Sequence, residues 1–122
     1  MTKILVITST RADFGLLKNL INSFKKNKFD CKVLASGTHF SKYYGYTSNE
    51  IKSENIKIDF NLKQEIITKN SNGISKIISQ FIKQVTIILN KANPDLVVLL
   101  GDRYEILGAA VAAHISRIPI AH

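Results

Sequence analysis

The sequence predicts an α/β fold in which helices flank a parallel sheet. Short runs rich in Val, Ile and Leu recur along its 122 residues, as in strands that are buried on both faces. Longer segments with the helical spacing of apolar residues separate these runs. Each apolar run is followed by a polar or Gly-containing turn. Strands that alternate with helices in this way imply right-handed crossovers and a parallel sheet.

The first third of the chain is expected to form two buried strands joined by a helix. Residues 3–8 (KILVIT) and 31–36 are the strands, and Gly37 follows the second. Between them, residues 13–26 place apolar side chains on one helical stripe, and Asp13 suits the N-terminal turn of that helix.

The middle of the chain gives weaker signals. Residues 46–54 form an amphipathic segment. In residues 56–62, apolar side chains alternate with polar ones. A period of two predicts an edge strand with one face exposed to solvent.

The last part of the chain returns to strong signals. Residues 73–92 are predicted to be a long helix in spite of many β-branched residues, because their helical spacing outweighs their propensity. An Asn-Pro pair ends this helix and leads into an apolar strand at residues 95–100. An Ala-rich helix over residues 104–116 then precedes a fifth strand at residues 118–122.

These five strands suit a Rossmann-like sheet with the order 3-2-1-4-5, in which the first and fourth strands are neighbours. Ligands bind beyond the carboxyl ends of the strands in such sheets, at the point where the strand order reverses. A domain of this kind usually continues with another helix and strand. We therefore expect residues 1–122 to form an incomplete, truncated domain whose open sheet edge favours self-association.

Composition narrows the class of protein. With 45% hydrophobic and 21% charged residues, the chain has the make-up of a soluble globular domain. No apolar run approaches the roughly 20 residues of a membrane span, and no signal peptide is recognisable. The single Cys31 excludes an internal disulfide and favours a cytoplasmic location. The net charge of +8 comes from scattered lysines, so nucleic-acid binding is not expected.

Two loops are expected to face each other where the first and fourth strands end. Residues 9–13 would lie opposite residues 101–103. Arg11, just ahead of a helix N-terminus, suits a diphosphate, because helix N–H groups and a guanidinium both attract the anion. Equally, Arg11 could pair with Asp13 or Asp102 and hold the loop. The sequence contains neither a P-loop nor G-x-G-x-x-G.

Asp102 is the main candidate for a catalytic carboxylate. It follows Gly101 directly after a buried strand, where it could act as a general base. A commoner role for Asp at such a place is the N-cap of the next helix. Glu105 stands at the capping-box spacing from Asp102, which supports the cap. Arg103 could pair with Asp102 or with another carboxylate nearby.

Histidines complete the set of candidates. His39 follows the second strand and His122 ends the fifth, so both belong to the same sheet edge as Arg11. His114, inside the Ala-rich helix, is expected to be structural. No group of residues has metal-ligand spacing, and Cys31 lies within a strand, so neither a metal nor a cysteine nucleophile is indicated.

Four segments of the chain together form a recognisable set: KILVITSTRADFGLLKNL, ASGTHFSKYYGYT, the register I-x-x-x-x-I-x-I-D-F, and PDLVVLLGDRYEILGAAVAAHISRIPIAH. These segments resemble the hydrolysing UDP-N-acetylglucosamine 2-epimerases of the sialic-acid and legionaminic-acid pathway type. The T-R-A-D-[YF]-G and L-G-D-R-Y-E motifs carry the resemblance, since related non-hydrolysing epimerases typically show T-R-P-E and H-G-D-T there. The resemblance covers nearly the whole chain but only the first third of a family member.

The resemblance implies two Rossmann-like domains of the GT-B type, with a UDP- or GDP-linked amino sugar between them. It implies elimination of the nucleotide to a 2-acetamidoglucal, then addition of water with inversion at C2. UDP and N-acetylmannosamine, or a diacetamido analogue, would be released without a cofactor. The full-length protein would be a homo-oligomer.

The resemblance also assigns roles to residues. Asp102 resembles the active-site carboxylate, His39 and His122 match family histidines at their strand ends, and Arg11 is similar to the phosphate-side arginine. We therefore expect Asp102, His39 and His122 to be catalytic. The residues expected to bind substrate are Arg11, Asp13, Arg103 and Glu105.

The chain departs from the family pattern in three places. Ser9 replaces a common Gly, Tyr46 replaces a common Asn, and the chain stops at His122, before the H-G-G-E segment and the C-terminal nucleotide-binding domain. We therefore expect residues 1–122 to be inactive alone. The N-domain of a GT-B glycosyltransferase and a non-catalytic nucleotide-binding module are the alternative interpretations.

Overall fold

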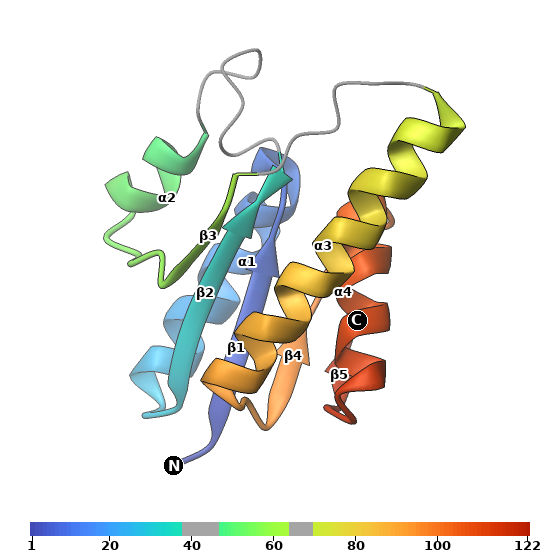
Figure 1. Ribbon diagram of the computed structural model, residues 1–122. Coiled ribbons are helices and arrows are strands. Elements are labelled where there is room, and N and C mark those ends of the chain that lie inside the picture. The colour runs from blue at the N-terminus through green and yellow to red at the C-terminus, as the bar shows by residue number, and fades with distance from the viewer. Residues whose placement is uncertain (38–46, 64–69) are drawn as a thin grey trace.

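The computed structural model describes residues 1–37, 47–63 and 70–122. Its elements are β1 (Lys3–Thr8), α1 (Arg11–Lys26), β2 (Asp30–Ser36), α2 (Ser48–Ser53), β3 (Phe60–Leu62), α3 (Ser71–Ala92), β4 (Leu96–Val98), α4 (Tyr104–Ile115) and β5 (Ile120–Ala121). The strands form one parallel sheet in the order β3-β2-β1-β4-β5. The predicted fold class and strand order are thereby confirmed (Figure 1).

The sheet separates two hydrophobic cores. Along β1, Leu5 and Ile7 face the core that α3 and α4 cover, whereas Ile4 and Val6 face the core that α1 and α2 cover. All four side chains are at most 3% exposed, as expected for a strand buried on both faces. The helices therefore lie on opposite faces of the sheet (Figure 1).

Helix ends follow the local sequence. Asn93 adopts a left-handed conformation (φ 46°) and ends α3, and Pro94 cannot continue a helix. Gly108 lets α4 approach α3 closely, because a Cβ added there would lie 2.9 Å from Cδ1 of Phe81. Within the described ranges, no helix combines the length and the apolar character needed to span a bilayer.

The predicted edge strand is wrong over its first half. Residues 56–62 were expected to alternate as one strand, but only Phe60–Leu62 does so. Asp59 is the cause: its carboxylate accepts a hydrogen bond from Val33 N (2.9 Å), while its own N–H donates to Val33 O (2.9 Å). The apolar side chains before and after Asp59 therefore lie on opposite faces of the sheet. Ile56 and Ile58 pack on the core of α1 and α2, whereas β3 packs on the other core.

Candidate functional site

A cavity of about 610 Å³ opens at the carboxyl edge of the sheet. One wall is the start of α1, residues 10–13 and Leu16, and the other is residues 100–103 after β4. Thr47, just ahead of α2, completes the described lining. The loops that follow β1 and β4 therefore face each other, as the sequence predicts.

Asp13 organises the loop between β1 and α1. Its carboxylate accepts hydrogen bonds from Ser9 N and Oγ (both 3.1 Å), from Thr10 N (3.0 Å) and from Thr8 Oγ1. Thr10 Oγ1 accepts in return from Asp13 N (3.1 Å), which completes a capping box. Asp13 lines the cavity but is only 7% exposed, and these bonds engage both of its oxygens. Its observed role is to shape the loop that carries Arg11.

Arg11 pairs with Glu50, a residue that no motif in the sequence points to. Its Nε lies 3.1 Å from Oε2 of Glu50 on α2, and its side chain is 74% exposed. The interpretation in which Arg11 pairs with Asp13 or Asp102 is therefore wrong. Arg11 lines the cavity at the N-terminus of α1, and because its pair with Glu50 is exposed and lies beside a second hollow that both residues line, an anion in the cavity can compete with Glu50 for the guanidinium.

Asp102 is not a helix cap. Helix α4 begins at Tyr104 with Arg103 at the N-cap position, and no side chain caps it, so the expected capping box between Asp102 and Glu105 is wrong. Gly101, at φ 93°, turns the chain just before this point. In the described part of the chain, Asp102 is exposed and makes no hydrogen bond or ion pair. Its carboxylate is thus available to a ligand in the cavity.

Glu105 is buried at the start of α4, close to the loops after β1 and β2. Its side chain is 5% exposed, and its Oε2 lies 3.3 Å from Nε of Arg103. A Cβ added to Gly37 at the end of β2 would lie 3.1 Å from Oε1 of Glu105 and 3.1 Å from O of Ser9. Arg103 therefore pairs with a neighbouring carboxylate, one of the two partners that the sequence leaves open. Arg103 lines the cavity, whereas Glu105 does not appear in its described lining.

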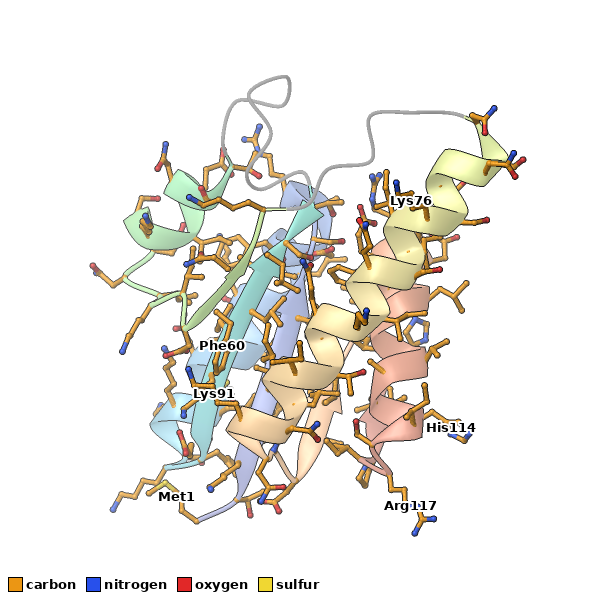
Figure 2. The ribbon with its side chains drawn as sticks, viewed as in Figure 1. Met1, Phe60, Lys76, Lys91, His114 and Arg117 are labelled. Atoms are coloured by element: carbon orange, nitrogen blue, oxygen red, sulfur yellow. The ribbon has the colours of Figure 1, made fainter. Side chains whose placement is uncertain are left out.

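The three histidines lie in different settings. His122 Nε2 donates to O of Gly101 (2.8 Å), so the end of β5 reaches the loop of Asp102. His114 is exposed and points away from the sheet at the C-terminal end of α4, opposite the cavity (Figure 2). His39 and the neighbouring Tyr46 lie outside the described residues.

Cys31 is expected to react slowly with thiol reagents. It is buried in β2, and burial raises the pKa of its thiol to about 11. Because only the thiolate is nucleophilic, about one thiol in a thousand would be reactive at pH 8. We expect Ellman's reagent to label the folded chain far more slowly than the chain in urea. Equal rates in both conditions would contradict the buried position of Cys31.

Comparison with known proteins identifies relatives of the whole chain. A family model described as UDP-N-acetylglucosamine 2-epimerase matches residues 22–122. A Legionella pneumophila protein named UDP-N,N'-diacetylbacillosamine 2-epimerase (hydrolyzing) is 33% identical over 98% of this chain and 32% of its own length. A Campylobacter jejuni protein named GDP/UDP-N,N'-diacetylbacillosamine 2-epimerase (hydrolyzing) is also 33% identical, over 98% of this chain and 31% of its own.

Solved structures agree on the fold. The Neisseria meningitidis UDP-GlcNAc 2-epimerase, bound to UDP-GlcNAc, matches with a TM-score of 0.80 at 24% identity, over 99% of this chain and 32% of that one. A Methanocaldococcus jannaschii UDP-GlcNAc 2-epimerase in complex with UDP-GlcNAc and UDP matches with a TM-score of 0.82 at 22% identity, over 99% and 32% of the two chains. The chain thus spans about a third of the length of these relatives.

Proposed function

The chain belongs to the UDP-N-acetylglucosamine 2-epimerase family, and we propose that it forms the N-terminal, sugar-side wall of a hydrolysing enzyme of that family. The observation that carries the proposal is the carboxylate of Asp102, which has no partner among the described residues and lies across one cavity from Arg11 at a helix N-terminus. Elimination from a nucleotide-diphosphate sugar needs both kinds of group: a base that removes the C2 proton and a cation that stabilises the departing diphosphate.

The proposed reaction has two steps. First, Asp102 removes the C2 proton while the C1–O bond breaks, and the bond electrons leave with the nucleoside diphosphate. Arg11 and the N–H groups at the start of α1 stabilise the charge that develops on the departing phosphate. Second, water adds to the resulting 2-acetamidoglucal: its hydroxyl goes to C1, and a proton returns to C2 from the opposite face. The free sugar leaves with inverted configuration at C2.

The names of the relatives support both the hydrolysing subtype and the sugar class that we propose. The names of two relatives include the word hydrolyzing and a diacetamido sugar. The T-R-A-D and G-D-R-Y-E motifs support the same subtype. We propose UDP-N-acetylglucosamine or a diacetamido analogue as substrate, with no cofactor, and a cytoplasmic homo-oligomer as the complete protein. A second, nucleotide-binding domain is proposed to form the opposite wall.

Product analysis tests this proposal. The complete protein that contains residues 1–122 is incubated with UDP-N-acetylglucosamine and, separately, with its UDP-diacetamido analogue. We expect UDP and a free C2-inverted sugar in equal amounts from at least one substrate. A C2 epimer that is still attached to UDP would instead show a non-hydrolysing enzyme. If neither substrate releases UDP, the proposal is contradicted, whether or not the configuration at C2 of the UDP-linked sugar has inverted.

Glu50 is expected to weaken substrate binding. In Glu50→Gln the carboxylate that competes for Arg11 loses its charge, so we expect KM to fall about threefold at low salt and less at high salt. Folding should not change, because an exposed ion pair contributes little. A matched control is Glu54→Gln, which breaks the second ion pair between α1 and α2 (Lys18 Nζ to Glu54 Oε1, 3.7 Å). A rise in KM for Glu50→Gln alone would show that Glu50 positions Arg11 productively.

A further inference from the structure

The cavity has an apolar strip as well as its charged groups. Leu16 on α1 lines it and is 72% exposed. Ala12, one turn earlier on the same helix and also exposed, lines the same wall, and Leu100 lines the facing one. We refer to Ala12, Leu16 and Leu100 as the apolar strip.

An exposed leucine alone needs no explanation, because single apolar side chains are common on protein surfaces. The apolar strip differs by its position. It shares a cavity with Arg11, Asp102 and Arg103, and most of the surface that the described residues give to this cavity is apolar. Sites for small molecules commonly combine a few charged groups, which fix orientation, with apolar surface for the rest of the ligand.

The apolar strip lies where it can contact the C4 and C6 substituents of a bound sugar, at the end of the ring opposite the C1 phosphate. Leu16 follows Arg11 by five residues, which corresponds to about 7.5 Å along the helix axis and about 140° around it, and both residues line the cavity. That distance is comparable to the span of a pyranose ring with its substituents. A sugar whose C1 phosphate lies at Arg11 can therefore place its C4 and C6 substituents beside Leu16.

The chemistry of those substituents decides between two substrates, on the premise of the proposed function. N-acetylglucosamine has hydroxyl groups at C4 and C6, and burying a hydroxyl against a leucine without a hydrogen bond costs free energy. A 2,4-diacetamido-2,4,6-trideoxy sugar has instead a C6 methyl group and, at C4, a second acetamido group, whose methyl group can contact Leu16 while its N–H and C=O groups face water. We infer that Leu16 is a specificity-determining residue, which selects a nucleotide sugar with methyl groups at its far end.

The ratio of two specificity constants tests this inference. The complete protein is assayed with the UDP-linked diacetamido trideoxy sugar and with UDP-N-acetylglucosamine, and kcat/KM is compared. We expect the wild type to prefer the first sugar, and Leu16→Ala to reduce that preference about fourfold to tenfold through a higher KM. Leu16→Met, which keeps the apolar surface, should retain the preference.

Leu20→Ala is the matched control. Leu20 is an exposed leucine one turn beyond Leu16 on α1, outside the described cavity lining, so its removal should leave the ratio unchanged. An unchanged ratio in Leu16→Ala, with both sugars cleaved, would overturn the inference, and so would a wild-type preference for UDP-N-acetylglucosamine. If neither sugar is cleaved, the proposed function is wrong. The role of Leu16 is then tested by the ratio of the dissociation constants of the two sugars, measured by calorimetry on the same variants. A ratio that is unchanged in Leu16→Ala would overturn the inference.

Discussion

Replacing Asp102 with asparagine is expected to lower kcat of the complete protein by about a hundredfold or more while leaving its stability unchanged. The amide has the shape of the carboxylate but cannot accept the C2 proton, and loss of a general base typically costs this much in rate. Stability should not change because Asp102 is exposed and makes no bond or ion pair in the described part of the chain. Initial rates of UDP release and a thermal melt measure the two quantities.

Asp95 provides the control for this substitution. It lies at the opposite end of the sheet, where its Oδ2 accepts from N of Lys3 (2.8 Å). Asp95→Asn should therefore keep kcat. Equal rates in Asp102→Asn and the wild type would remove Asp102 from the mechanism. A large drop in the melting temperature of Asp102→Asn would contradict its lack of structural contacts.

Replacing Asp13 with alanine is expected to destabilise the fold by about 2–4 kcal/mol. The change removes a capping box, worth about 1 kcal/mol, and leaves N–H and O–H donors of Thr8 and Ser9, both fully buried, without this acceptor. In a domain of this size, such a loss lowers the melting temperature by about 10 °C or more. Nucleotide-sugar binding should weaken as well, because the same loop carries Arg11.

Asp95→Ala is the matched comparison for the stability measurement. It removes one carboxylate that accepts a single exposed hydrogen bond, and it should cost less than about 1 kcal/mol. A melting temperature for Asp13→Ala close to that of Asp95→Ala would contradict the account in which Asp13 holds the loop together.

Local patterns were sufficient for the central strands and for the two facing loops. Buried runs and helical stripes follow from periodicities that neighbouring residues determine. The order 3-2-1-4-5 is the Rossmann-like one among those that right-handed crossovers allow, and it places residues 9–13 opposite residues 101–103. The place of Asp13 in the first turn of α1 was similarly visible, because acidic side chains are favoured at helix N-termini.

Details that depend on tertiary contacts were not predictable. Glu50 meets Arg11 because Ile51, fully buried, packs α2 onto the core beside α1, and no local signal specifies that contact. Asp59 breaks the alternation of residues 56–62 by bonding to a backbone 26 residues away. The apparent capping box of Asp102 failed because α4 starts one residue later than that spacing requires.

Hydrogen exchange at C2 tests the central claim most directly. The complete protein is incubated in deuterated water with the nucleotide sugar that we propose as substrate, and the released sugar is analysed by mass spectrometry and proton NMR. If the cavity between Arg11 and Asp102 carries out elimination followed by rehydration, every released sugar molecule carries one deuteron at C2 and has inverted configuration there. A released sugar that retains its original C2 proton would contradict the account.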